Sequence, residues 1–175
     1  MAIFELIPTS VPVVATMMAE IMPEWWEYKS AFKQLSDISE AIESIGWYIG
    51  EDKNHPIGWA FFREYKSYRT IELECCGYND NGIFALEHKM KELFDRACEY
   101  AKSKGYLTFR TVMGSTQFSI HDRPLGDIGD EIKNLESYKH IDYDWLLSYG
   151  FRVIGIQPNA YEINHHAVIL AKDLT

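Results

Sequence analysis

The chain has 175 residues, with 17 Lys and Arg against 26 Asp and Glu, and a formal net charge of −9. This length predicts one domain over residues 1–175 that can bury a hydrophobic core. The basic residues are scattered along the chain, so a nucleic-acid-binding surface is not expected. Mild acidity is common among cytosolic proteins, so it gives only weak support for a cationic substrate.

The cysteine pattern and the hydropathy limit where the protein works. Cys75, Cys76 and Cys98 offer neither a disulfide framework nor zinc-ligand spacing, so we expect reduced core residues. No segment approaches the length of about 20 apolar residues that spans a bilayer, and residues 1–5 do not begin a signal peptide. The sequence therefore predicts a cytoplasmic protein with no membrane partner.

The N-terminal part predicts a strand and two helices. Residues 3–7 form the strand, Pro8 ends it, and Thr9 or Ser10 can cap the first helix. After Pro23 a second helix has four apolar residues at helical spacing: Trp25, Tyr28, Phe32 and Leu35.

Three strands follow. Residues 47–50 and 57–65 predict a hairpin with a polar turn, and residues 71–76 predict the next strand. Strict alternation in this strand places Ile71, Leu73 and Cys75 on one face and Glu72, Glu74 and Cys76 on the other.

A Gly/Asn turn over residues 77–82 leads from that strand into a long amphipathic helix that Gly105 ends. The apolar face of the helix carries Leu86, Met90, Leu93, Phe94, Ala97 and Ala101. A Gly-containing turn between a strand and a helix aims backbone N–H groups at one point, which favours phosphate.

The C-terminal part predicts a strand at 107–113, a short helix at 144–149 ended by Gly150, and strands at 151–156 and 167–170. Residues 114–141 are long for a connection. They predict either a functional loop or a small inserted element, with a helical pattern at 128–138.

This element order, together with Tyr149-Gly150-Phe151 before the last strand pair, resembles the GCN5-related N-acetyltransferase (GNAT) superfamily over nearly the whole chain. The resemblance implies an α/β (α+β) fold with a mixed, mostly antiparallel sheet of about seven strands flanked by helices. It also implies acetyl-CoA as the co-substrate and direct attack by a primary amine on its thioester. Fold alone does not fix function.

The family pattern for pyrophosphate binding, Gln/Arg-x-x-Gly-x-Gly/Ala, matches residues 79–84 best, where Gly82 agrees. Asn79 replaces the Gln/Arg and Phe84 replaces the small residue. A second alignment, on 85–90, contains no Gly. The resemblance implies cofactor contacts from Cys75, Cys76, Gly77, Asn79, Asn81, Gly82, Ile83 and Phe84, and a backbone N–H near Cys75 or Cys76 would polarise the thioester carbonyl.

The family's catalytic base often lies on the strand that corresponds to 71–76, which makes Glu72 and Glu74 the candidates; the alternative is that both simply face solvent. The family's acid, a Tyr four residues before the Gly of the Gly-Phe pair, is replaced by Leu146. Tyr143 and Tyr149 are nearby substitutes, although Tyr149 also suits packing or capping of the helix end.

The acceptor cleft of the family corresponds to residues 23–28. The candidates are Trp25, Trp26, Glu27 and Tyr28, since aromatic rings and carboxylates suit a protonated amine. The alternative is that Trp25 and Tyr28 form a core stripe, which leaves Trp26 and Glu27 as the pocket candidates. Residues 121–124 could close over a substrate. The histidines show no metal constellation, so we expect surface histidines and no metal.

The sequence as a whole predicts an acyl-CoA-dependent N-acyltransferase that acts on a small amine. One alternative is a GNAT-fold ligand-sensing or protein-binding module that has lost normal CoA-pyrophosphate binding. Another is an unrelated α/β enzyme with Cys75 or Cys76 as nucleophile, although no His is evidently paired with either. A homodimer is left open.

Overall fold

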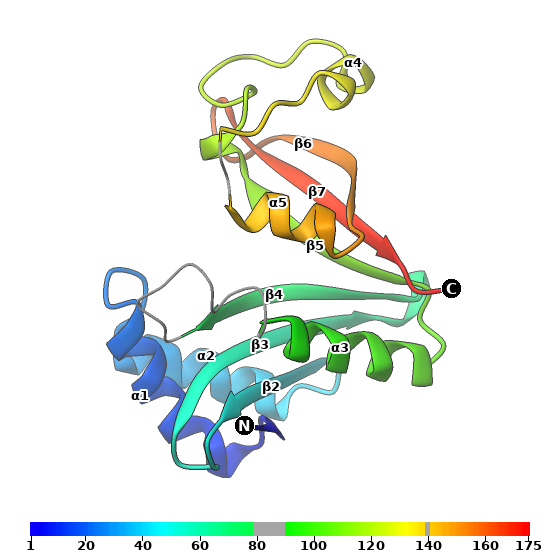
Figure 1. Cartoon of the computed structure of the whole chain (residues 1–175). Helices are drawn as coiled ribbons and strands as arrows, with labels where there is room; N and C mark the ends of the chain where they lie inside the picture. The colour runs from blue at the N-terminus through cyan, green and yellow to red at the C-terminus, as the bar shows by residue number, and fades with distance from the viewer. Residues whose placement is uncertain (79–89, 139–140) are drawn as a thin grey trace. The chain divides into compact units, whose positions relative to one another are not determined.

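The computed structural model describes residues 1–78, 90–138 and 141–175, and the chain divides into two compact units, 1–106 and 107–175 (Figure 1). Each unit has its own strands and helices. Within the described ranges, no helix is both long enough and apolar enough to cross a membrane. One domain over residues 1–175 stays a prediction.

The first unit has the predicted β-α-α-β-β-β-α order. Its elements are β1 (Ala2–Glu5), the 3-10 turn η1 (Pro8–Ser10), α1 (Val11–Ile21), α2 (Tyr28–Glu40), β2 (Ser44–Gly50), β3 (Pro56–Tyr65), the 3-10 turn η2 (Lys66–Tyr68), β4 (Thr70–Tyr78) and α3 (Lys91–Ser103). Strands β1 to β4 lie side by side in chain order, each antiparallel to the next.

Both faces of this first sheet are covered, because consecutive residues of a strand point to opposite sides. On β3, Phe61 packs in a buried cluster with residues of α1 and α2. The next residue, Phe62, stacks edge-on against Phe94 of α3, with ring centroids 6.4 Å apart. Helices α1 and α2 therefore cover one face and α3 covers the other.

A buried polar pair lies on the α3 side. The Tyr100 hydroxyl donates a 2.7 Å hydrogen bond to the Glu64 carboxylate, and Glu64 is buried. Burial raises the pKa of Tyr100, and the neighbouring Glu64 raises it further, so the hydroxyl keeps its proton. The buried Glu64 carboxylate thereby has a hydrogen-bond donor inside the unit.

Helix α3 and helix α5 (Ile141–Ser148) end in the same way, each at a Gly in the left-handed region. Gly105 has φ 75° and Gly150 has φ 101°. The N–H of the residue after each Gly bonds back to the last turn, from Tyr106 to Ala101 and from Phe151 to Leu146, at 2.9 Å in both cases. The helix ends predicted at both glycines are confirmed.

The second unit contains β5 (Thr108–Gly114), the 3-10 turn η4 (Ser115–Gln117), α4 (Ile128–Lys133), α5, β6 (Arg152–Glu162) and β7 (His165–Asp173). Its strands lie in the order β5-β7-β6, and both pairings are antiparallel. Strands β6 and β7 are longer than predicted, so the polar turn between them shrinks to residues 163–164. Register shifts in β6 interrupt the alternation of its side chains, so the sequence pattern did not predict the second half of this strand.

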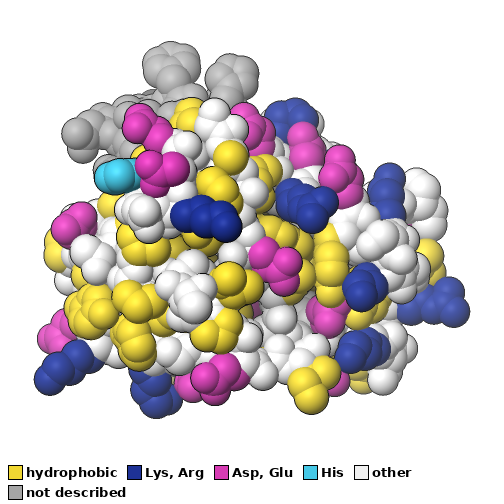
Figure 2. Space-filling model, turned by 90° about the horizontal axis from the view of Figure 1, so that it is seen from below, with side chains coloured by type: hydrophobic (Ala, Val, Ile, Leu, Met, Phe, Trp, Pro, Cys, Tyr) yellow, Lys and Arg dark blue, Asp and Glu magenta, His cyan; other side chains and the backbone are white. Residues whose placement is uncertain are grey.

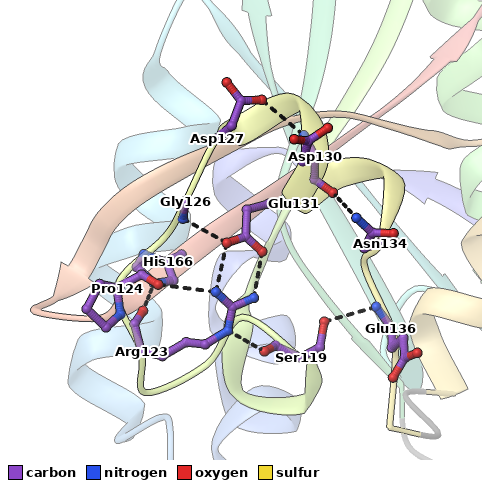
Figure 3. A network of polar contacts seen from close by, with 10 residues as sticks. All are labelled: Ser119, Arg123, Pro124, Gly126, Asp127, Asp130, Glu131, Asn134, Glu136 and His166. Atoms are coloured by element: carbon purple, nitrogen blue, oxygen red, sulfur yellow. Dashed lines mark hydrogen bonds and ion pairs between the residues drawn. The ribbon is translucent and has the colours of Figure 1, made fainter.

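The long connection between β5 and α5 contains a compact polar network (Figure 3). The Arg123 guanidinium contacts both carboxylate oxygens of Glu131, and the Gly126 N–H donates a 2.8 Å bond to the same carboxylate. Asp127 caps α4 by accepting from the Asp130 N–H at 3.1 Å. The predicted helical pattern is confirmed for 128–133, and closure of 121–124 over a substrate stays a prediction.

His166 is buried beside this network, so the prediction of surface histidines is wrong for this residue. Its Nδ1 accepts from the Asn159 N–H at 3.1 Å, which leaves Nε2–H to donate to the Arg123 carbonyl at 2.9 Å. The ring is satisfied on both sides. His88 and His140 lie outside the described residues.

The Arg123–Glu131 pair predicts a pH-dependent contribution to stability. The Arg123 contacts, and then the Gly126 N–H, lower the pKa of Glu131 to about 2. Because the pKa of Glu131 is lower in the folded state, the ion pair stabilises the protein at pH values above the unfolded pKa of about 4.3. This contribution is lost as the pH falls towards 2. Glu131→Gln should therefore lower the unfolding free energy at pH 6 and have a much smaller effect near pH 2.5, by urea unfolding.

In an Arg123→Gln background the same Glu131→Gln substitution should lose most of its pH dependence, because the main cause of the pKa shift is gone. An effect of equal size at both pH values in the otherwise native chain would contradict this prediction.

Candidate functional site

Strand β4 carries an irregularity at the predicted catalytic residues. Phe62 pairs with Leu73 and Phe61 pairs with Cys75, so Glu74 is an extra residue that forms a β-bulge. Because side chains alternate along a strand, one extra residue exchanges the faces beyond it. Cys75 packs with Phe61 on the α1 and α2 side. The prediction that it shares a face with Leu73 is wrong.

Arg63 on β3 engages the acidic side of β4. It lies directly opposite Glu72 in the strand register. Its Nε is 3.1 Å from Oε1 of Glu74 and its Nη2 is 3.3 Å from Oε2. Both oxygens of Glu74 are therefore held by one guanidinium, which fixes the position of the carboxylate.

The Cys75 thiol lies next to this acidic side. Burial raises its pKa, contact with the Trp59 indole opposes this rise, and the Glu74 charge adds to it. A thiol held in its protonated form is a poor nucleophile. This environment argues against Cys75 as a catalytic nucleophile. All three cysteines are reduced thiols that are half-buried rather than fully buried.

Gly77 belongs to β4 and not to the predicted turn. The Trp59 ring lies against it, so a Cβ on residue 77 would be only 2.4 Å from the nearest ring carbon. A close approach of an indole thus explains this Gly. The rest of the predicted cofactor loop, Asn79, Asn81, Gly82, Ile83 and Phe84, lies outside the described residues.

The four predicted acceptor residues fall at the start of α2. The helix begins at Tyr28, with Glu27 as its N-cap residue, so Trp25 and Trp26 precede it. Trp25 is 72% exposed and Tyr28 is 44% exposed, so a core stripe is wrong for both. Trp26 is partly buried against the cluster of α1 and α2. Helical spacing failed for Trp25 because the helix starts after it, and for Tyr28 because the buried face of α2 is formed by Ala31 and Leu35.

Trp25, Tyr28 and Phe32 are all exposed, and we refer to them as the aromatic row. The rings of Tyr28 and Phe32 are 5.9 Å apart, and the exposed Glu27 lies within the same segment. Aromatic faces and a carboxylate together attract an organic cation.

Figure 2 shows one face of the molecule, on which Lys and Arg side chains are interspersed with Asp and Glu around hydrophobic side chains. The described part of that face has no continuous basic surface. The absence of a nucleic-acid partner stays a prediction.

The two tyrosine candidates lie in the second unit. The Tyr143 ring packs edge-on against Phe118 at 4.9 Å, and burial, followed by the Asp144 charge, raises its pKa. A hydroxyl that keeps its proton can serve as an acid. Leu146 is buried, as befits an apolar residue of α5.

Tyr149 is held by its surroundings. The Lys172 Nζ lies 3.6 Å from the centre of its ring and donates a 2.6 Å hydrogen bond to its carbonyl. Its ring also stacks on Trp145 at 5.2 Å. These contacts support packing at the helix end as the role of Tyr149.

Comparison with known proteins identifies the fold. No family model matches the chain, and no curated protein matches its sequence. Among solved structures, the aminoglycoside 6'-N-acetyltransferase from Enterococcus faecium matches with a TM-score of 0.83 and 15% identity, over 100% of this chain and 98% of that one. An aminoglycoside 6'-N-acetyltransferase complexed with coenzyme A matches with a TM-score of 0.82, at the same identity and coverage.

A protein from Desulfovibrio desulfuricans assigned to the GNAT family matches with a TM-score of 0.70 and 11% identity, over 99% of this chain and 100% of that one. The chain therefore has the GNAT fold, and the predicted α/β class with about seven strands is confirmed. At these identities the likeness establishes the fold alone.

The contact between Gly77 and Trp59 predicts a structural penalty for any side chain at residue 77. Gly77→Ala should lower the unfolding free energy by about 1–3 kcal/mol through overpacking, measured by urea unfolding. Gly155→Ala in β6 is the matched control, because its Cβ would make an ordinary 3.7 Å contact with the Ile169 side chain of β7. Equal effects of the two substitutions would rule out this explanation of Gly77.

Proposed function

We propose that the protein is an acetyl-CoA-dependent N-acetyltransferase that acts on a primary amine of a small molecule. The observation that carries this proposal is the pair of carboxylates at the β4 bulge in a chain with the GNAT fold. The amine nitrogen attacks the thioester carbonyl, an N–C bond forms, and the C–S bond breaks. CoA leaves as a thiolate that takes up a proton, and the base takes the proton of the amine.

Glu72 is our candidate for the base, and Glu74 is our candidate for a positioning residue. Arg63 contacts both oxygens of Glu74, which holds that carboxylate in place on β4. Together, Arg63 and Glu74 fix the strand on which Glu72 lies. A base must come within hydrogen-bond reach of the proton that it removes, directly or through one water.

The other steps draw on groups whose roles any GNAT-type mechanism requires. A backbone N–H near Cys75 or Cys76 would polarise the thioester carbonyl. Tyr143 is our candidate for protonating the leaving thiolate, although burial raises its pKa and so makes its hydroxyl a weaker acid. Tyr149 is better assigned to packing, because Lys172 and Trp145 hold its ring. A thiol titrates near about 8.5, so the thiolate is a tolerable leaving group even without an acid.

The aromatic row and Glu27 support a protonated small amine as the acceptor, through cation–π and charge contacts. Two of the solved structures similar to this chain are aminoglycoside 6'-N-acetyltransferases. Aminoglycosides are therefore the first amines to test, followed by simple polyamines.

Calorimetry with acetyl-CoA and with CoA tests the co-substrate. Saturable binding with one site per chain is expected. If neither ligand binds at millimolar concentration, the enzyme assignment fails, and a ligand-sensing or protein-binding role takes its place.

The assignment of the base predicts a difference between two otherwise similar substitutions. With a saturating amine, Glu72→Gln should lower kcat by about 100-fold or more, because the proton acceptor is lost. Glu74→Gln should lower it less and should act partly through KM. Acetyl-CoA binding serves as the control for correct folding of both variants. Unchanged kcat in Glu72→Gln would remove Glu72 from the mechanism.

The aromatic row predicts a change in amine affinity. Trp25→Ala should raise KM for the amine several-fold, with little change in kcat, because one exposed aromatic face is lost. Tyr68→Ala is the matched control, since Tyr68 is 80% exposed on η2, outside the row. If both substitutions change KM equally, the row is not the acceptor surface.

A further inference from the structure

Three potential metal ligands come together in the second unit. His121 and Asp122 lie in the turn after η4, and His165 is the first residue of β7. Among the described residues, one ligand atom from each of these three lies within 4.8 Å of the other two. The Asp122 Oδ1 is 2.9 Å from the His165 Nε2, and its Oδ2 is 3.5 Å from the His121 Nε2.

These separations suit a common metal ion. Two ligands at about 2.0 Å from a tetrahedral zinc ion lie about 3.3 Å apart. The two nitrogen–oxygen distances lie on either side of that value. Small rotations of exposed or half-buried side chains would therefore bring all three ligands to bonding distance.

One of the two histidines, His121, also has a hydrogen-bonding partner on the nitrogen that does not face Asp122. The Ser115 hydroxyl lies 3.1 Å from the His121 Nδ1, and its oxygen accepts a 3.0 Å bond from the buried His166 N–H. The Glu162 carboxylate lies 3.9 Å from the His165 Nδ1, which is beyond hydrogen-bond distance but within ion-pair range. Metal-binding histidines generally direct their second nitrogen to such a hydroxyl, carboxylate or carbonyl, which fixes the tautomer that leaves Nε2 free to bind.

The two segments that carry the ligands are already joined through the backbone. The Asp122 N–H donates a 3.2 Å bond to the carbonyl of Asn164, in the turn between β6 and β7. The His121 and His165 rings are 4.5 Å apart and tilted by 37°, so their nitrogens converge without the rings lying face to face. The two backbone segments that carry the ligands are thus held together by the fold.

We propose that His121, Asp122 and His165 bind a divalent transition-metal ion such as Zn²⁺, which links the turn after η4 to the β6–β7 turn. Two imidazoles and one carboxylate favour zinc and its neighbours over Mg²⁺ and Ca²⁺, which prefer oxygen ligands. The ion would join segments 43 residues apart in the chain and so stabilise the second unit. Because Asp122 is exposed, a fourth position stays open to water.

This site neither requires nor supports the proposed acetyl transfer. The sequence predicted no metal, because ligands from segments so far apart leave no short spacing to recognise.

Calorimetric titration of the full chain with Zn²⁺ at neutral pH tests the proposal. One ion per chain should bind with micromolar or tighter affinity, and the melting temperature should rise with the Zn²⁺ concentration. Millimolar Mg²⁺ should not displace the ion. His165→Gln and Asp122→Asn should each weaken binding at least tenfold.

His55→Gln is the matched control, because His55 and Asp52 form an exposed pair at 2.9 Å that no third potential ligand joins among the described residues. Its Zn²⁺ affinity should equal that of the native chain. Asp122→Asn tests the site independently if His165→Gln fails to fold. No binding, or equal affinity in the native chain and both site variants, would overturn the proposal.

Discussion

The bulge at Glu74 is the constraint on which the acidic side of β4 depends. Side chains along a strand alternate with a period of two, so one extra residue changes the side of every residue beyond it. In β4 the extra residue places Cys75 on the side of α1 and α2. It also places Gly77 opposite Trp59, whose ring packs against this Gly. Without the extra residue, the Glu74 carboxylate and the Cys75 thiol would lie on opposite sides of the sheet.

Much of the fold could be predicted from the sequence because local patterns determine it. Helical spacing correctly predicted the buried face of α3, which includes Leu93, Phe94 and Ala97. Two helix ends were correctly predicted at Gly105 and Gly150. The bulge could not be predicted in this way. In segment 71–76 the side chains alternate in sequence without interruption. Only the pairing with β3 reveals that Glu74 has no residue opposite it on that strand.

The same limit applies to contacts between distant segments. Trp25 and Trp26 are neighbours in sequence, yet only packing against α1 and α2 decides that Trp26 is the more buried of the two. The cluster of His121, Asp122 and His165 forms because the β6–β7 turn returns to the turn after η4. Sequence spacing reports neighbours along one element, whereas such sites are set by the pairing of strands.

Arg63 explains how one strand can carry two glutamates close together. Like charges at short range repel each other, and the guanidinium offsets this repulsion from the facing strand. Its two contacts engage both oxygens of Glu74. Glu74 is thereby tied to the facing strand, which is why we assign it to positioning in the proposed mechanism and keep Glu72 as the candidate base.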